Sequence, residues 1–316
     1  MLRLDEAPIS PFEIDHLGHM NVRHYGTRAR RGVAKLFEMA GLPRNELKAR
    51  GVKIVLGDVF NHYLREQFEG AMLVVQGGVS RIDGDGVEIF VELINEAKDE
   101  RAATFLIRPW LCDVKTRARV PVPEDASKRA AQMLIDMPAY AAPRSLDLSK
   151  PVEKSFAEIE QLSGGETFPP QMTGVKIKAE ACDEHGYLKF GTAQEIMMTG
   201  FEIDLADPLK ERERRKDLEI ARDPAGRRIA LAQLENRQLV LGYPRVGDNI
   251  KTFSATFDHG AKTLRARRWV FNQETGALYA ILDNVMIALD LDARRAVNVP
   301  DYMRANLKSR ALAEPA

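Results

Sequence analysis

One short stretch near the amino terminus combines a carboxylate, three histidines, a glycine and an asparagine. Residues 14–25 read IDHLGHMNVRHY, and His16, His19 and His24 are half of the six histidines in the chain. The apolar periodicity of a helix begins directly after this stretch. An enzyme active site, a metal site and a polar loop that caps a helix are the three interpretations that such a composition allows.

The spacing of the polar residues has a chemical meaning if a helix begins at about residue 22. The first N–H groups of a helix lack intrahelical partners, and the helix dipole makes this end positive. Gly18 would let a ligand carbonyl approach the main chain closely. N–H groups near Met20–Val22 would then form an oxyanion hole, in which one donor contributes roughly 10²–10³ in rate. Asp15 would stay ionised there and either attack a carbonyl or take a proton from water. The pattern favours hydrolysis of an activated acyl group.

Two other interpretations of the stretch stay open. Asp15 and Asn21 can simply cap a turn and a helix. A metal site would need His16, His19 and His24 to converge, and a loop that runs into a helix does not require this. In the catalytic interpretation, His19 and Asn21 orient the carboxylate, the substrate or the water.

The helix that has to position this stretch is predicted to follow at once. Asn21 is a favourable N-cap, and Gly41 followed by Pro43 is a typical end. Apolar residues mark one helix face at Val22, Tyr25, Ala29, Val33, Leu36 and Ala40. Strand-like segments then follow at Val52–Phe60, Ala71–Ile82, Val87–Glu96 and Ala102–Cys112. The first part of the chain therefore predicts an α+β unit, one helix followed by antiparallel strands.

The sequence also contains an internal repeat. DVKTRARVPVP at residues 113–123 shares its Asp, Arg and Val-x-Val-Pro spacing with DLDARRAVNVP at residues 290–300. The same shift along the chain aligns Gly70 with Gly247. Chance similarity among turn residues is the alternative, but two tandem copies explain the length of 316 residues better than one large domain.

The repeat predicts the domain boundaries. The first domain spans residues 1–125, a linker spans 126–170, and a second, degenerate domain spans 171–316. The linker contains a short amphipathic helix candidate, Ser127–Asp136, followed by segments rich in proline and glycine.

The string DHLGHMN at residues 15–21, followed by Tyr25, a helix and a strand meander, resembles the hotdog-fold acyl-CoA thioesterases. Within them it is most similar to the 4-hydroxybenzoyl-CoA thioesterase-like branch and its betainyl-CoA thioesterase relatives. The resemblance covers about residues 9–123 and, more faintly, residues 171–307. It implies a tandem double hotdog, in which each long helix is wrapped by an antiparallel sheet. It also implies that Asp15 is the catalytic carboxylate and that the amino end of the helix stabilises the thioester oxyanion.

A second segment, NHYLRE at residues 61–66, resembles a family segment that carries a histidine and a glutamate on a strand beside the site. Asn61 stands where many relatives have a threonine. The residues expected at the catalytic site are then Asp15, Gly18, His19, Asn21, His62 and Glu66.

The second copy lacks most of this polar set. Asp183 and Gly186 match Asp15 and Gly18 in type and spacing. The other four positions are occupied by Tyr187 for His19, Lys189 for Asn21, Leu239 for His62 and Tyr243 for Glu66. One complete set and one eroded set indicate a chemical role in the first copy, with the second copy supplying pocket walls.

The bulk composition excludes several classes of protein. Lys+Arg and Asp+Glu balance at 46 each, so no net charge attracts nucleic acid or an anionic membrane. Two cysteines cannot form a disulfide framework, and no signal peptide or membrane helix is evident, which favours a cytoplasmic protein. No metal or cofactor is expected besides the coenzyme A thioester as substrate. Assembly of such chains into a homo-oligomer is left open.

Two basic segments are candidates for contact with the phosphates of coenzyme A. They are the cluster Arg28, Arg30 and Arg31 and the stretch Glu211–Lys216. A solvated helix face explains both equally. A non-catalytic acyl-CoA or lipid-binding module is the main rival to a thioesterase, and a hotdog hydratase or dehydratase is the weaker one. The chain has no Gly-x-Ser-x-Gly sequence, which disfavours an α/β-hydrolase.

Overall fold

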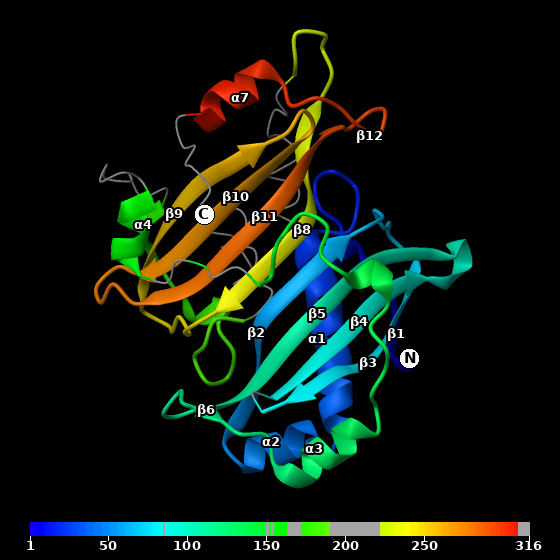
Figure 1. Ribbon diagram of the computed structural model, residues 1–316, viewed down its shortest axis with the longest axis vertical. Helices are drawn as coiled ribbons and strands as arrows, with labels where there is room; N and C mark the ends of the chain where they lie inside the picture. The colour runs from blue at the N-terminus through cyan, green and yellow to red at the C-terminus, as the bar shows by residue number, and fades with distance from the viewer. Residues whose placement is uncertain (85, 150–151, 153–154, 163–171, 190–221, 309–316) are drawn as a thin grey trace. The chain divides into compact units, whose positions relative to one another are not determined.

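One long helix and five antiparallel strands form the amino-terminal half of the computed structural model (Figure 1). The structure describes residues 1–84, 86–149, 152, 155–162, 172–189 and 222–308. The chain divides into two units, Met1–Ala142 and Pro143–Ala316.

Helix α1 (Val22–Met39) is the central element of the first unit. Asn21 caps it with an extended backbone, at φ −65° and ψ 139°, and its side chain accepts a hydrogen bond from the Arg23 N–H at 3.1 Å. The predicted helix and its N-cap are confirmed. Gly32 allows a close approach to the sheet, because a Cβ there would lie 2.9 Å from Cγ1 of Val75. The buried face comprises Tyr25, Gly26, Arg28, Ala29, Gly32, Val33, Leu36 and Phe37.

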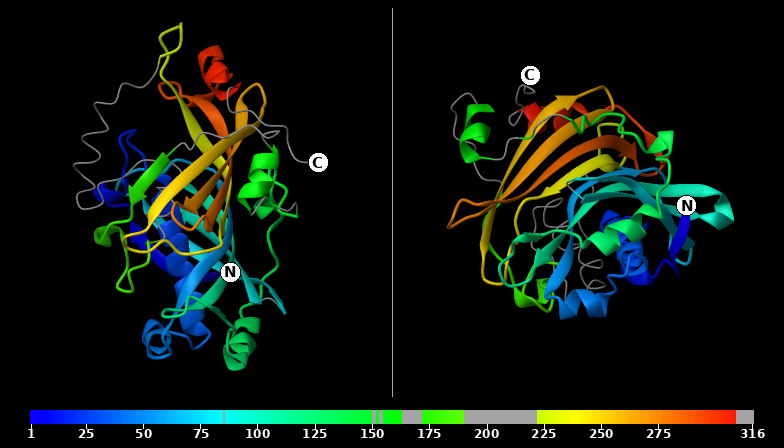
Figure 2. Two further views of the ribbon diagram at one scale, coloured as in Figure 1. Left: turned by 90° about the vertical axis from the view of Figure 1, so that its left-hand side faces the viewer. Right: turned by 60° about the horizontal axis from the view of Figure 1, so that its bottom comes forward.

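The sheet of the first unit has the strand order β1-β3-β4-β5-β2 and is antiparallel throughout. Its strands are β1 (Leu2–Pro8), β2 (Val52–Tyr63), β3 (Met72–Asp83), β4 (Gly86–Asn95) and β5 (Glu100–Asp113), with a short β6 (Arg119–Val120) beside β5. The helix packs across one face of this sheet (Figure 2). The four predicted strands are confirmed, within a few residues at their ends. Strand β1 was not expected, because its alternation of apolar and charged residues is only seven residues long.

The strand register decides which side chains face α1. Val91 of β4 faces the helix, since its Cγ1 lies 3.4 Å from the place of a Cβ at Gly32. Val91 pairs with Phe105 of β5, which pairs with Asn61 of β2. Paired residues on neighbouring strands point to the same face, so Asn61 faces α1. His62, the next residue, points to the opposite face.

The segment after β6 packs against the first unit as well. Helix α3 (Glu124–Ala131) begins three residues before the expected Ser127 and ends five residues before the expected Asp136. The 3-10 helix η3 (Ala139–Ala141) places the Tyr140 hydroxyl 2.9 Å from the Glu92 carboxylate. Glu92 also accepts a hydrogen bond from Nε of Arg101 at 2.6 Å, and that guanidinium lies 3.6 Å above the Tyr140 ring. These contacts fix the carboxyl-terminal end of the first unit on the sheet.

The second unit repeats the strand order of the first. Its sheet runs β7-β9-β10-β11-β8, in the same sequence of positions as β1-β3-β4-β5-β2. The first residues of β2 and β8, Val52 and Ile229, are related by the shift that aligns Gly70 with Gly247, and so are those of β3 and β9, Met72 and Asn249. The bounds are β7 (Met172–Lys176), β8 (Ile229–Val240), β9 (Asn249–His259), β10 (Thr263–Asn272), β11 (Leu278–Asp290) and β12 (Arg295–Ala296). The central helix expected for this copy, like the basic stretch Glu211–Lys216, lies outside the described residues.

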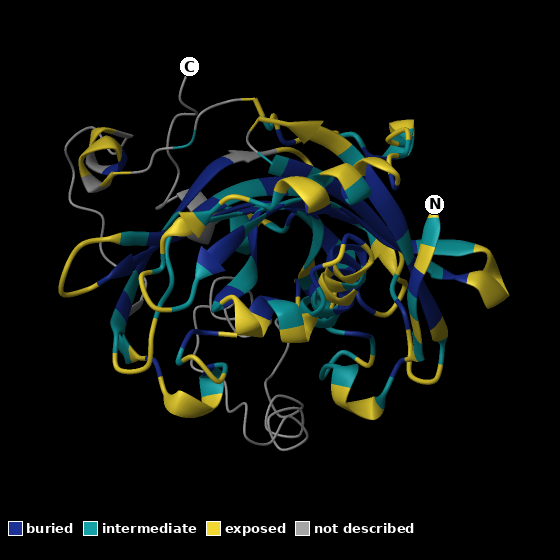
Figure 3. Ribbon diagram, turned by 90° about the horizontal axis from the view of Figure 1, so that it is seen from below, coloured by how far each residue is buried: buried dark blue, intermediate teal, exposed yellow. Residues whose placement is uncertain are grey.

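Most strand residues of both units are buried (Figure 3). In the second unit, one apolar cluster around Ile250, Val270 and Leu282 includes the loop residue Leu188. Another cluster, around Phe253, Trp269 and Phe271, packs on Ile159 of helix α4 (Phe156–Leu162). Among the described residues, no helix has the length and hydropathy to cross a membrane.

Candidate active site

Residues 14–20 form a closed loop directly before α1. The Asp15 N–H donates to the His19 carbonyl at 2.9 Å, and the Gly18 N–H donates to the Asp15 carbonyl at 3.1 Å. Gly18 has φ 85°, a left-handed conformation that glycine adopts without strain. The Leu17 N–H donates to Oδ1 of Asp15 at 2.9 Å. One carboxylate oxygen of Asp15 therefore closes the turn, and the other, Oδ2, is left to face a different partner.

That partner is His19, whose imidazole lies between two carboxylates. Oδ2 of Asp15 is 3.5 Å from Nδ1 of His19, and Oε1 of Glu66 is 3.4 Å from Nε2. The Asp15 and His19 side chains are 13% and 16% exposed, and that of Glu66 is 32% exposed. The group is thus half-buried, and Glu66 is its most exposed member. The His19 imidazole therefore links the two carboxylates and orients that of Asp15.

The backbone donors at the helix end are fewer than the sequence predicts. The Met20 N–H donates to the Gln67 carbonyl at 2.7 Å, and the Asn21 N–H donates to the Glu13 carbonyl at 2.8 Å. These two of the three expected oxyanion donors are therefore engaged, which corrects that part of the prediction. The first helical N–H, that of Val22, has no hydrogen-bond acceptor in the described part of the chain. No sequence pattern marks Gln67, although its carbonyl anchors the loop.

His62 is separated from this group. It lies on the face of β2 directed away from α1, is 2% exposed, and its ring packs edge-on against Phe60 with centroids 4.9 Å apart. Glu66 follows the end of β2 and reaches the loop side, where it contacts His19. Strand alternation within residues 61–63 is the sequence signal that distinguishes the two faces.

The first turn of α1 adds two titratable side chains. The His24 imidazole accepts a hydrogen bond from Nε of Arg23 at 3.0 Å, and burial, followed by the positive charge of Arg23, lowers the pKa of His24 to about 4. The Tyr25 hydroxyl donates to the Arg65 carbonyl at 3.3 Å, and burial raises the pKa of Tyr25 well above its ordinary value. His24 is thus neutral near pH 7. No three His, Cys, Asp or Glu side chains in the described ranges are arranged to hold a metal ion.

Arg28 has a structural environment rather than a solvated one. It is 2% exposed, and its guanidinium makes two hydrogen bonds to the Glu13 carboxylate, at 2.7 and 2.9 Å. It also donates to the carbonyls of Ala7 and Pro8, at 2.7 and 2.8 Å. Arg28 is therefore committed inside the unit, and the expectation that it meets coenzyme A phosphates is wrong.

The second unit contains the same loop with different side chains. The Asp183 N–H donates to the Tyr187 carbonyl at 2.7 Å, the Gly186 N–H donates to the Asp183 carbonyl at 2.9 Å, and Gly186 has φ 76°. Oδ1 of Asp183 accepts from the His185 N–H, as Oδ1 of Asp15 does from Leu17. In place of the His19–Glu66 pair, however, the rings of Tyr187 and Tyr243 lie 5.4 Å apart. The second loop keeps the backbone and replaces the ionisable contact with an aromatic one.

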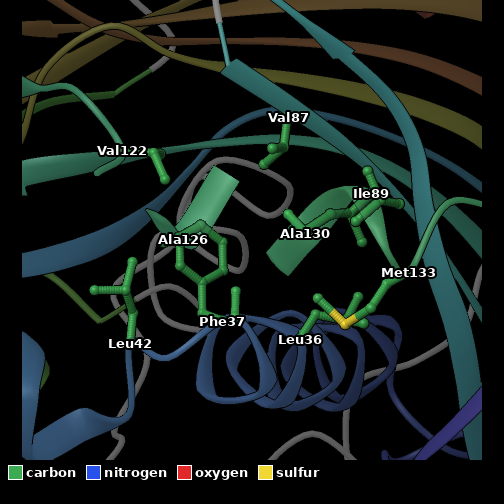
Figure 4. Close-up of a pocket in the computed structure, with 11 residues that line it drawn as sticks. Leu36, Phe37, Leu42, Val87, Ile89, Val122, Ala126, Ala130 and Met133 are labelled. Atoms are coloured by element: carbon green, nitrogen blue, oxygen red, sulfur yellow. The ribbon is translucent and has the colours of Figure 1, made fainter. Parts of the chain in front are cut away.

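A small apolar pocket lies at the other end of α1 (Figure 4). Leu36 and Phe37 of the helix face Ile89 of β4, and α3 closes it with Ala126 and Ala130. Its volume is about 20 Å³, the space of roughly one water molecule. Leu36 is 15 residues beyond Asn21, which is about 22 Å along a helix. The pocket has no polar side chain, whereas Asp15, His19 and Glu66 lie at the amino end of α1.

Comparison with known proteins finds a family model that matches part of the chain. Residues 9–130, which include α1 and the loop, match the model of the thioesterase-like superfamily. An acyl-ACP thioesterase from Bacteroides thetaiotaomicron superposes with a TM-score of 0.62 at 12% identity, over 89% of this chain and 96% of that one. The 12:0-ACP thioesterase from Umbellularia californica gives 0.63 at 9% identity, over 90% and 93%. The chain therefore has the hotdog thioesterase fold. No curated protein matches it in sequence.

Proposed function

We propose that this protein is a thioester hydrolase that acts on an acyl-CoA, with Asp15 as general base or nucleophile. The observation that carries the proposal is the contact chain Asp15–His19–Glu66 at the amino end of α1. The match of residues 9–130 to the thioesterase-like superfamily supports it, and the internal repeat supports a tandem double hotdog. The 4-hydroxybenzoyl-CoA thioesterase-like branch with its betainyl-CoA relatives remains the proposed affiliation.

In the proposed mechanism, the thioester carbonyl lies at the positive end of α1 and accepts a hydrogen bond from the Val22 N–H. Oδ2 of Asp15 takes a proton from a water molecule as the water oxygen bonds to the carbonyl carbon, or attacks that carbon itself. With water as the nucleophile, the tetrahedral intermediate expels the thiolate, which takes up the proton held by Asp15, and the products are a carboxylic acid and free thiol. With Asp15 as the nucleophile, loss of the thiolate leaves a mixed anhydride on Asp15, and a water molecule then hydrolyses it to the carboxylic acid and the free Asp15 carboxylate. His19, held by Glu66, orients the Asp15 carboxylate and stabilises its charge.

The carrier of the acyl group is a further part of the proposal. Coenzyme A is proposed because the sequence resembles acyl-CoA thioesterases. The two structural neighbours are named as thioesterases of acyl carrier protein, so acyl carrier protein is the alternative carrier to compare. The shared chemistry is a pantetheine thioester.

Release of thiol from a panel of acyl-CoA and acyl-ACP substrates tests the function. Asp15→Asn keeps an acceptor oxygen for the Leu17 N–H and removes the base, so kcat/KM should fall by about 10²–10⁴ without loss of fold. Circular dichroism and thermal unfolding serve as the fold control. Turnover that survives Asp15→Asn would refute the assignment of Asp15. Binding of acyl-CoA without any thiol release would instead identify a non-catalytic binding module, and water addition to an enoyl-CoA would identify a hydratase.

A further inference from the structure

Tyr25, in the first turn of α1, is a buried tyrosine that the proposed mechanism does not use. It is 3% exposed, and its ring packs edge-on against the Tyr63 ring of β2, with centroids 5.6 Å apart. A phenylalanine ring would pack in the same way, and a buried tyrosine hydroxyl usually has a hydrogen-bond partner. The contacts of the hydroxyl therefore show what the tyrosine adds at this position.

The Tyr25 hydroxyl contacts the backbone on both sides of Glu66. It donates a hydrogen bond to the Arg65 carbonyl at 3.3 Å. Burial raises the pKa of Tyr25, and the Gln67 N–H, which also acts on the hydroxyl, opposes this rise. A hydroxyl can donate and accept at once, so one oxygen serves both peptide groups that flank Glu66. A side chain of α1 thus fixes the backbone from which Glu66 projects.

The chain directly after Glu66 is anchored as well. The Gln67 carbonyl accepts the Met20 N–H at 2.7 Å, and the Gln67 side-chain oxygen accepts a hydrogen bond from Asn95 of β4 at 2.9 Å. From this fixed backbone, Oε1 of Glu66 reaches to 3.4 Å from Nε2 of His19. Since that distance already exceeds the usual ~2.7–3.2 Å of a hydrogen bond, displacement of the backbone would readily break the contact.

The sequence of the second copy lacks both the hydroxyl and the carboxylate. With the two Asp-x-x-Gly loops aligned, Ala193 stands at the position of Tyr25. Tyr243 stands at the position of Glu66. The copy without the carboxylate is thus also the copy without the tyrosine hydroxyl, as expected if the hydroxyl serves the carboxylate.

We propose that Tyr25 is a positioning residue of the active site, whose hydroxyl holds Glu66 against His19 and thereby orients the Asp15 carboxylate. The inference deepens the proposed thioesterase function and rests on it. A shift of about 1 Å in a reacting group can lower the rate by on the order of 10². The buried hydroxyl is occupied by the backbone around Glu66, so its removal should affect the chemical step and not the affinity for the thioester.

The test measures thiol release by the full-length Tyr25→Phe protein, which keeps the ring that packs on Tyr63. The value of kcat should fall by about ten- to a hundredfold, whereas KM should change by less than about twofold. In the background of Glu66→Ala, Tyr25→Phe should have little further effect, because a hydroxyl that acts through Glu66 then has no carboxylate to position. Urea unfolding and circular dichroism establish that each variant is folded.

Tyr140→Phe is the matched control. It also removes one buried-side hydroxyl contact of the first unit, the hydrogen bond to the Glu92 carboxylate at 2.9 Å. Glu92 follows Val91, which faces α1, so this contact lies on the opposite face of the sheet. The kcat of Tyr140→Phe should stay close to that of the wild type.

A measurement without turnover separates failure of this inference from failure of the proposed function. In NMR spectra of protein with isotope-labelled histidine, the ring resonance of His19 is assigned with His19→Gln. It should move in Tyr25→Phe toward its position in Glu66→Ala, and it should stay in place in Tyr140→Phe. If no acyl-CoA releases thiol, the proposed function fails, and this resonance alone decides the positioning role.

Three results would overturn the inference. The first is a His19 resonance that Tyr25→Phe leaves in place. The second is a higher KM at unchanged kcat in Tyr25→Phe. The third is that Tyr25→Phe lowers kcat by the same factor with and without Glu66→Ala, because the hydroxyl would then act independently of the carboxylate.

Discussion

At the scale of single residues, Asp15 performs two tasks with its two oxygens. Oδ1 accepts the Leu17 N–H and holds the turn, and Oδ2 faces His19. The capping and the catalytic interpretations of this residue are therefore compatible. A polar residue that shapes a loop can also present a reactive atom from it, provided that its second oxygen points elsewhere.

His24, in the first turn of α1, differs from His19 in its environment, because Arg23 donates a hydrogen bond to its ring, whereas two carboxylates lie beside the ring of His19. Its imidazole is neutral in the folded protein, because burial and Arg23 lower its pKa to about 4. In the unfolded chain its pKa returns to about 6.5. Between these pH values the unfolded state binds one proton more than the folded state. The free energy of unfolding should therefore fall by about 3 kcal/mol as the pH is lowered from 6.5 to 4.

Urea unfolding of wild type and His24→Gln across this pH range measures the effect. Carboxylates contribute to both proteins, so the difference between the two curves isolates His24. The variant should lose less stability on acidification, with a shallower slope by almost one proton. Parallel curves for the two proteins would contradict the assignment.

At the scale of elements, Arg28 joins helix α1 to strand β1 and to the 3-10 helix that precedes the loop of residues 14–20. It reaches from α1 to the end of β1, at Ala7 and Pro8, and to Glu13 in the 3-10 helix η1 (Pro11–Glu13). The Glu13 carbonyl accepts the Asn21 N–H at the helix cap. Burial by itself would raise the pKa of Glu13, but the hydrogen bonds from Arg28 and Ser10 lower it below the ordinary value. The ion pair thus fixes the entry of the chain into α1.

Arg28→Met should destabilise the protein by about 3 kcal/mol, because it leaves the half-buried Glu13 carboxylate and two backbone carbonyls without their donor. The double variant Glu13→Gln/Arg28→Met should recover part of this loss, since the uncompensated charge is gone. Chemical denaturation of the two variants, with Arg30→Met as a surface control, gives both values. Equal losses for Arg28→Met and Arg30→Met would show that the pair contributes no more than a surface charge.

The elements themselves follow from local sequence patterns. Asn21 and Gly41 mark the ends of α1, and apolar runs mark β2 to β5, so these could be predicted. Strand alternation separates His62 from Asn61 and Tyr63, but a match by resemblance does not use it, and the expectation of His62 at the site is wrong for that reason. Arg28 resembled a surface residue because its buried partner, Glu13, is 15 residues away in a different element.

At the scale of the whole molecule, the described parts of the two units share a strand order and an Asp-x-x-Gly loop, and the side chains beside that loop differ. Strands repeat at a constant offset along the chain, as in Val52 and Ile229, and each Asp-x-x-Gly loop closes with the same hydrogen bonds. The His19–Glu66 pair of the first unit corresponds to the Tyr187–Tyr243 pair of the second. Oδ1 of Asp183 accepts hydrogen bonds from the His185 and Tyr187 N–H groups, so the turn of the loop accounts for an aspartate at this position. The ionisable pair is what the first loop adds, and the proposed chemistry is assigned to the first loop for this reason.

Because the side chains beside the two loops differ, we expect the same Asp→Asn substitution to have different effects in the two units. Asp15→Asn and Asp183→Asn both keep an acceptor oxygen for the turn, so each should change the free energy of unfolding by no more than about 0.5 kcal/mol. Thiol release should fall only in Asp15→Asn, because Asp183 has an aromatic pair where Asp15 has His19 and Glu66. Parallel measurement of kcat/KM and urea denaturation on the two single variants tests this.

Loss of turnover in Asp183→Asn with an intact fold would mean that the second loop takes part in the reaction. A large loss of stability in either variant would mean that the turn requires the charge and not only the oxygen.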